Sequence, residues 1–344
     1  MKKRKRIIII SSIILFLLIS YFLGGIIASN IVLNNIFDKR GSDLSSLLNV
    51  EERIYKTRND YDILKERTEY YFYNNYNEKL VGYYYKTNDS KGLVISAHGM
   101  TSQADSFDAE YQSYFVENGY DLFSFDLTAS GKSEGNSMRG LHQSAYDVYS
   151  AYTFLKANNL LENNLILVGH SWGAYGVATS LSLGVKANYL ITFSAFDNPY
   201  DTYIRYSKNY MGDFINLTIP SFFISTEIKY GKNNRLSASQ AIKDSNIKSL
   251  IIHGNNDNSI PYDNEALYNH VKDYSNCETL LLDGINHNRP WLSIESMEYV
   301  NDNINNKIKE LKDNELDTFI NNIDKNKTTE LSNIVFNKIN NFLN

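Results

Sequence analysis

From residue 67 onward, short apolar runs alternate with segments whose apolar residues recur at helical spacing. The predicted strands are 92–99, 121–126, 164–169, 188–195, 249–254 and 278–284, and the predicted helices are 109–119, 144–158 and 172–183. Apolar runs of this length bounded by glycine or polar residues are typical of buried strands. Strands that alternate with helices indicate a mostly parallel sheet covered on both faces. The pattern therefore predicts a doubly wound α/β fold.

Three further segments depart from this alternation. Residues 68–87, "TEYYFYNNYNEKLVGYYYKT", contain two aromatic strand-like runs around a polar turn, which predicts a β-hairpin. Residues 197–246 separate two predicted strands by far more than the usual short loop, and they are rich in Tyr, Phe, Asn and Ser. Residues 301–330 form a charged helical insertion before a last helix at 331–343. We interpret 197–246 and 301–330 as insertions into one domain.

The N-terminus combines a basic start with a long apolar stretch. Five consecutive basic residues, 2–6, precede the uncharged residues 7–29, and about 20 apolar residues suffice to cross the hydrocarbon core of a bilayer. A cleavable signal peptide usually has a shorter apolar region and an A-x-A-like exit, whereas Ile26 stands two positions before Ala28. We favour an uncleaved transmembrane signal anchor, with a removed signal peptide as the alternative.

These features divide the chain into three parts. Residues 1–29 are the basic N-terminus and the anchor, 30–66 a stalk or linker, and 67–344 the folded domain. The basic residues favour a cytoplasmic N-terminus. The sequence therefore predicts a single-pass protein of the cell membrane whose folded domain is extracytoplasmic.

Composition narrows the function classes. The net charge is −5, and no basic stripe is interleaved with aromatic residues, which argues against nucleic acid as a partner. A single cysteine, Cys277, excludes an internal disulfide and a cysteine-rich metal site.

The segment Gly169–Gly173, "GHSWG", is the strongest candidate for chemistry. It matches the G-x-S-x-G nucleophile elbow, in which a strained strand-to-helix turn lifts the serine oxygen clear of a sheet. A buried strand is predicted directly before it, and a helix of small residues directly after it. A simple Gly-Ser turn would not require that context. Ser171 is therefore the candidate nucleophile.

A serine hydroxyl needs an adjacent base, and the chain has six histidines. His287, in the loop "GINHNRP" after the last predicted strand, is the preferred candidate. The less favoured ones are His98, His170 and His253 at strand ends, His142 before a helix, and His270 within a helix.

The base in turn needs an orienting acid. Asp257 lies three residues past Gly254, in a loop that follows a buried strand, and such loops assemble sites at the carboxyl edge of a parallel sheet. A calcium loop is a poorer interpretation, because the glycine and glutamate positions of an EF-hand are not matched. Asp197 and Asp283 are weaker candidates for the acid.

A developing oxyanion needs preorganised N–H donors. Trp172 follows the candidate nucleophile and can offer its backbone N–H. Met100, after His98 and Gly99 at the end of the predicted strand 92–99, can offer a second.

Taken together, these motifs resemble the α/β-hydrolase superfamily over about residues 68–295 and the closing helix. The matching elements are His98-Gly99-Met100, Asp126 with Ser130–Ser133, Gly169–Gly173, the loop from His253 to Pro261, and Gly284 with His287. Nucleophile, acid and base follow in the order Ser…Asp…His, as in that superfamily. The insertion at 301–330 and the anchor depart from its pattern.

The resemblance implies the α/β-hydrolase fold and a serine hydrolase that cleaves carboxylic esters through an acyl-enzyme. The catalytic residues would be Ser171, Asp257 and His287, with Met100 and Trp172 in the oxyanion hole, and no cofactor or metal would be needed. Residues 197–246 would form a lid, whose aromatic and apolar residues suit a small-molecule or lipid-like ester. A peptidase or acyltransferase with the same triad, or a non-catalytic binding protein, are the alternatives.

Overall fold

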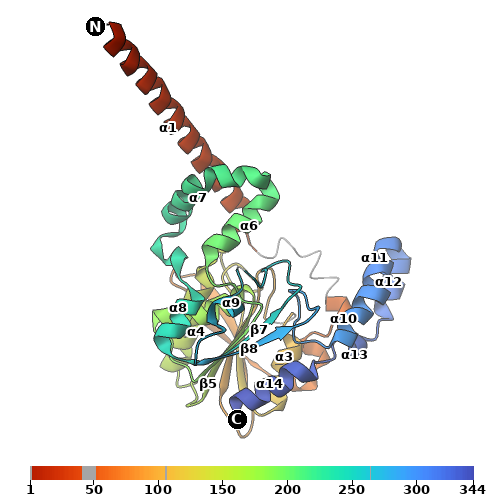
Figure 1. The fold of residues 1–344 in the computed structure, drawn as a ribbon. Helices are drawn as coiled ribbons and strands as arrows, with labels where there is room; N and C mark the ends of the chain where they lie inside the picture. Colours follow the sequence, from red (N-terminus) through yellow and green to blue (C-terminus); the bar gives the residue numbers. More distant parts are fainter. Residues whose placement is uncertain (1, 41–51, 105–106, 264) are drawn as a thin grey trace.

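A computed structural model of the chain describes residues 2–40, 52–104, 107–263 and 265–344. Its centre is one eight-stranded sheet, which Figure 1 shows below helices α6 and α7. The strands are β1 (Thr68–Tyr73), β2 (Lys79–Tyr85), β3 (Leu93–Ala97), β4 (Asp121–Phe125), β5 (Leu165–His170), β6 (Tyr189–Phe193), β7 (Lys248–Gly254) and β8 (Cys277–Leu282). Every strand and the hairpin predicted from the sequence are present.

The strand order is β1-β2-β4-β3-β5-β6-β7-β8. The hairpin β1–β2 is antiparallel, with Thr68 opposite Tyr84, and β2 runs antiparallel to β4. All pairs from β4 to β8 are parallel. Because parallel strands end at one edge, the loops after β3, β5, β7 and β8 meet there. The predicted doubly wound, mostly parallel sheet is confirmed.

Helices cover both faces of the sheet because the strands are apolar on both faces. In β3, Leu93, Ile95 and Ala97 join one buried cluster, whereas Val94 joins the other. The first cluster lies under α4 (Gln143–Ala157), α5 (Trp172–Thr179) and α8 (Ala238–Ser245), and the second under α3 (Ala109–Glu117) and α14 (Asn333–Leu343). Side chains that alternate along a strand thus supply two separate cores.

The segment 197–246 is a helical insertion between β6 and β7. It contains α6 (Pro199–Met211), a 3-10 turn at Gly212–Phe214, α7 (Ile215–Tyr230) and α8. Asn198 begins α6 by accepting hydrogen bonds from two backbone N–H groups of the first turn, and Gly212 ends it with a φ of 56°. Figure 1 shows α6 and α7 standing off the sheet layers toward the N-terminal helix.

That N-terminal helix, α1, is continuous over Lys2–Ile36. It is long and apolar enough to cross a membrane, and its most apolar part is unburied. It extends beyond the predicted anchor boundary at residue 29, because residues 30–36 continue its helical hydrogen bonding. Figure 1 shows its first half projecting away from the rest of the molecule.

The chain that follows α1 is attached to the folded domain. Phe37 is fully buried against Tyr203 and Tyr206 of α6. Arg40 donates hydrogen bonds to the carbonyls of Gly131, Ser133 and Gly135 at 2.6–2.9 Å. Part of the predicted stalk at 30–66 therefore packs on the domain, while its residues 41–51 lie outside the described residues. The division into domains stays a prediction.

The insertion at 301–330 packs on the other described part of the predicted stalk. After α10 (Ile294–Val300) come a π-helical segment at Asn301–Asn305, α11 (Asn306–Glu310), α12 (Asp313–Asn321) and α13 (Lys325–Thr328). Lys325 Nζ donates to the carbonyl of Glu52 at 2.9 Å, and the Thr328 hydroxyl donates to that of Ile54 at 2.7 Å. Ile54 is buried with Val300 and Ile304.

Candidate active site

Ser171 sits on a sharp turn between β5 and α5. Its φ of 53° and ψ of −115° place it in a backbone region that non-glycine residues rarely occupy. A Cβ added at Gly173 would lie 2.1 Å from the carbonyl oxygen of Ala97, and one at Gly169 would lie 2.6 Å from the carbonyl carbon of Gly173. Both positions require glycine because backbone atoms, which cannot move aside, occupy that space. The turn has the geometry of a nucleophile elbow.

The three residues predicted from the sequence as a triad lie in hydrogen-bond contact. His287 Nε2 is 2.9 Å from Ser171 Oγ, and His287 Nδ1 is 2.7 Å from Asp257 Oδ2. The Asp257 side chain is fully buried, and the imidazole is largely buried. They come from the loops after β5, β7 and β8, which the parallel sheet brings to one edge. This arrangement can pass a proton from a hydroxyl to an imidazole.

Asp257 is held as a carboxylate by several donors. Its Oδ1 accepts the backbone N–H groups of Ser259 and Ile260 at 2.8 and 2.7 Å, which leaves Oδ2 facing the imidazole. Burial opposes ionisation, but the contacts with His287, His253 and the Ile260 N–H outweigh it and hold the pKa of Asp257 below its usual range. A permanent negative charge at this place favours the protonated form of the neighbouring imidazole.

The other candidate acids have different partners. Asp197 accepts a hydrogen bond from the backbone N–H of Ser239 at 2.7 Å and contacts the Ser237 hydroxyl at the start of α8. Asp283 accepts from the side chain of Asn255 at 2.7 Å. Neither is bonded to His287 in the described structure, so Asp257 is the acid that the geometry selects.

The remaining histidines at strand ends support the loops. His98 Nε2 accepts the backbone N–H of Leu127 at 3.0 Å, while its Nδ1 contacts the Gly99 carbonyl. Burial lowers the pKa of His98 to about 4. His253 Nε2 contacts the carbonyl of Ile260 at 2.9 Å, beside the acid. Each of these imidazoles bridges a strand end to a neighbouring loop, and burial lowers the pKa of both.

His170, next to the nucleophile, supports the base loop. Its Nε2 donates to the backbone carbonyl of His287 at 3.0 Å, and its ring stacks on Phe107. Burial, together with the neighbouring His287, lowers the pKa of His170 to about 3, so it donates as a neutral imidazole. His142 precedes α4 and is buried beside Tyr146 and Tyr230. Burial lowers its pKa to about 4.

Two backbone positions adjoin the serine where an oxyanion would form. Trp172 is the first residue of α5, so its N–H belongs to the group at a helix start that has no partner within the helix. A Cβ at Gly99 would lie 3.4 Å from Ser171 Cβ, which brings the turn containing Met100 against the nucleophile. The oxyanion role of Met100 and Trp172 stays a prediction.

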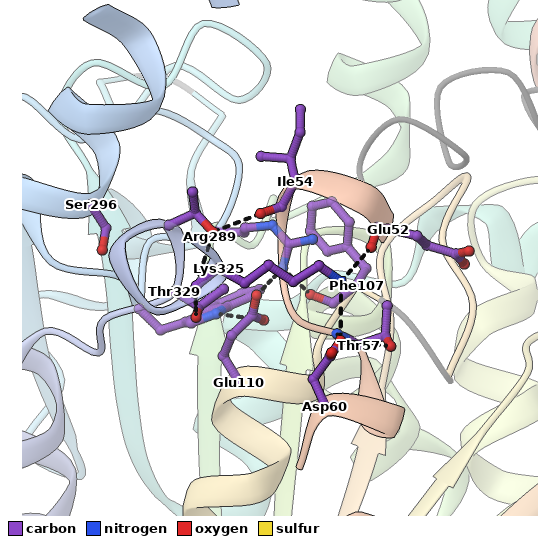
Figure 2. A network of polar contacts seen from close by, with 12 residues as sticks. Glu52, Ile54, Thr57, Asp60, Phe107, Glu110, Arg289, Ser296, Lys325 and Thr329 are labelled. Atoms are coloured by element: carbon purple, nitrogen blue, oxygen red, sulfur yellow. Dashed lines mark hydrogen bonds and ion pairs between the residues drawn. The ribbon is translucent and has the colours of Figure 1, made fainter. Parts of the chain in front are cut away.

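Arg289, two residues after the base, was not predicted from the sequence. Its guanidinium lies between the rings of Tyr55 and Phe107, 4.0 and 4.2 Å from their centroids. It pairs with Glu110 at 2.5 Å and donates to the Phe107 carbonyl at 2.6 Å (Figure 2). Arg289 has a φ of 54°, a strained conformation for a side-chain-bearing residue. These contacts fix the loop that carries His287.

The Arg289 cluster is continuous with the contacts of the C-terminal insertion. Lys325 joins the carbonyl of Glu52 and the carboxylate of Asp60, and Figure 2 shows these groups beside Arg289 and Glu110. The insertion thereby holds the segment around Tyr55, and the ring of Tyr55 stays against the guanidinium of Arg289. A cavity of about 420 Å³ lies on this side of the base loop, between Tyr55 and the insertion, and none of the three triad side chains lines it.

Replacing Arg289 by lysine tests this support. Lysine keeps the charge but loses the planar fork and the stacking, so we expect the unfolding free energy of the detergent-solubilised chain to fall by about 2 kcal/mol. Reaction of Ser171 with a fluorophosphonate should slow as well. Arg53→Lys is the matched control, since Arg53 makes exposed bonds to Asp317, and it should change stability by at most about 0.5 kcal/mol. Equal stability of both variants would contradict the role of Arg289.

Comparison with known proteins gives a match to one family model. Residues 88–247, which include the nucleophile and the helical insertion, match the family model described as "Serine aminopeptidase, S33". No curated protein sequence matches the chain.

Solved structures support the same fold. An esterase from Pyrococcus furiosus is 20% identical, with a TM-score of 0.51 over 72% of this chain and 92% of that chain. A puromycin-hydrolyzing peptidase from Mycobacterium tuberculosis is 14% identical, with a TM-score of 0.50 over 65% of this chain and 36% of that chain. At such identities these similarities establish the fold alone. Together with the family match and the elbow, they show that the chain belongs to the α/β-hydrolase superfamily.

Proposed function

We propose that this protein is a serine hydrolase that cleaves carboxylic esters through an acyl-enzyme on Ser171. The observation that carries the proposal is the pair of hydrogen bonds made by His287, 2.9 Å to Ser171 Oγ and 2.7 Å to Asp257 Oδ2. An imidazole placed between a hydroxyl and a buried carboxylate is the arrangement that activates a serine.

The steps follow from those contacts. His287 Nε2 takes the hydroxyl proton as Ser171 Oγ attacks the ester carbonyl carbon, and the carbonyl oxygen becomes an oxyanion facing the N–H groups of Met100 and Trp172. Collapse of the intermediate expels the alcohol, which receives the proton from His287. Water then repeats the sequence on the acyl-enzyme and releases the acid. Asp257 stabilises the imidazolium in both halves of the reaction.

Amide hydrolysis and acyl transfer use the same intermediate, so the triad alone does not separate them. We favour esters because the insertion 197–246 is rich in aromatic and apolar residues. An apolar lid suits an acyl chain better than a charged peptide terminus. A carboxylesterase or lipase-like activity on a small-molecule or lipid-like ester is therefore the first choice, and a peptidase the second, because the matched family model describes an aminopeptidase.

We place the enzyme at the cell membrane through α1. The helix begins with the five basic residues 2–6, and the apolar part that follows them is unburied. Basic residues at one end favour retention of that end in the cytoplasm, which would leave the hydrolase domain on the other side of the membrane.

Labelling with a fluorophosphonate probe tests the nucleophile. The wild-type chain should be labelled and Ser171→Ala should not. Asp257→Asn should slow labelling by about 10³–10⁴-fold, because an amide can neither hold the right tautomer nor stabilise the imidazolium. Asp283→Asn, a nearby carboxylate outside the triad, is the control and should react like the wild type. A wild type that resists the probe would favour a non-catalytic binding protein.

The reaction class is tested by a substrate panel. We expect p-nitrophenyl esters of increasing chain length to be hydrolysed by the wild type, and the corresponding aminoacyl amides to be hydrolysed far more slowly. Release of p-nitrophenol or amine, measured beside Ser171→Ala, provides the readout. Turnover of the amides alone would replace the esterase by the peptidase.

Protease treatment of intact cells tests the orientation. With the N-terminus in the cytoplasm, added protease should remove the hydrolase domain while a cytoplasmic marker stays whole. A domain that survives until the cells are lysed would place it in the cytoplasm and overturn the proposed topology.

A further inference from the structure

The lid helix α7 packs along α1 through small residues. A Cβ at Gly25 would lie 2.6 Å from the Ser221 hydroxyl and 3.6 Å from the Thr218 methyl group, so the two helices approach closely. The Ser225 hydroxyl lies 3.5 Å from the carbonyl of Ile26. Close approach through small residues is how helices associate inside membranes.

The contacts run in the same direction along both helices. The Tyr21 hydroxyl donates to the carbonyl of Leu217 near the start of α7. Lys229, near its end, contacts Asn34 and Asp38 at 2.6 Å. Helix α7 is therefore parallel to α1 from about residue 21 to residue 34.

This register sets the level of α7 relative to a bilayer. If the hydrocarbon core begins at Ile7, where the basic residues end, about 20 residues carry it to Ile26. Tyr21 and the contacting Leu217 then lie about 8 Å inside the core boundary. Lys229 lies outside the boundary, at the level of Asn34, where its charge is solvated.

The polarity of α7 follows that level. Residues 215–226 contain no charged side chain; the charged residues that flank them are Asp213, exposed in the preceding turn, and Glu227 and Lys229 in the last turn of α7. At the other end, Phe214 and Leu217 are 54% and 59% exposed. Large apolar side chains presented to solvent at the end that adjoins a membrane helix match a surface that contacts lipid.

We propose that the start of α7, through the exposed side chains of Phe214 and Leu217, inserts into the edge of the bilayer that holds α1. The occupant of the exposed apolar side chains is thus lipid, at the depth of about 8 Å that the register with α1 gives for Leu217. The proposal rests on the proposed anchoring by α1. It makes the lid a second membrane contact, joined to the acid loop through Arg205 of α6, which pairs with Glu265 and donates to the carbonyl of Asn258.

Depth-dependent fluorescence quenching tests the insertion. In the full-length Cys277→Ser chain, single cysteines would carry an NBD fluorophore in Leu217→Cys, Ile228→Cys, Phe16→Cys and Ile334→Cys. Each chain is reconstituted in phosphatidylcholine–phosphatidylglycerol vesicles with lipids that carry a doxyl quencher on the acyl chain. Ile334 in α14 is 61% exposed and apolar but remote from α1, and it serves as the matched control. Phe16 is 68% exposed in α1 and reports the anchor itself.

We expect the label at position 217 to be quenched about threefold more than the label at position 334, with position 228, about 16 Å farther along α7, between them. Strong quenching at position 16 with no more quenching at 217 than at 334 would overturn the insertion and leave the anchor intact. Weak quenching at position 16 would overturn the anchoring and the insertion with it. The esterase proposal is independent of either result, because fluorophosphonate labelling of Ser171 reports it separately.

Discussion

The close contact between the end of β3 and the start of α5 is the constraint on which the site depends. The backbone of Ala97 and His98 passes so near Gly173 that no side chain fits between them. That approach allows the turn at Ser171 to adopt its strained conformation and brings the Gly99 turn beside the serine. The nucleophile and the candidate oxyanion donors are therefore positioned by one packing contact, and the surrounding sheet makes that contact rigid.

The base reaches this turn from the opposite end of the domain sequence, and its support is distributed. His170 donates to its carbonyl, Asp257 holds its ring, and Arg289 fixes the chain just beyond it. A planar guanidinium between two rings, paired with a buried carboxylate, resists displacement in several directions at once. The imidazole is thus held by one group and its loop by two others, none of which contacts the reacting bond.

The sequence predicted the sheet and the triad because both leave local signals. Strands such as 164–169 are continuous apolar runs, and Asp257 and His287 each follow such a run in a glycine-containing loop. Parallel strands then bring those loops together without further information. Arg289 leaves no such signal: its partner Glu110 is 179 residues away and lies in an ordinary helical segment. The hydrogen bond between Lys325 and the carbonyl of Glu52 joins residues that are even farther apart, by 273 positions. The helix α1 continues beyond the predicted anchor because the polar residues there, such as Asn30 and Asn35, donate to carbonyls one turn back in the same helix, which an apolar-run criterion does not detect.

The hydrogen bonds from Arg40 to three backbone carbonyls affect how such an enzyme would find its substrate. A hydrolase on a flexible linker would sample a wide range of distances from the membrane and a wide range of orientations. If α1 is the membrane anchor that we propose, the bonds of Arg40, four residues after the end of α1, would keep Ser171 at a set height and angle above the lipid headgroups. Encounters with membrane molecules would then resemble a search over a plane, in which molecules that diffuse laterally in the leaflet arrive in a repeated orientation.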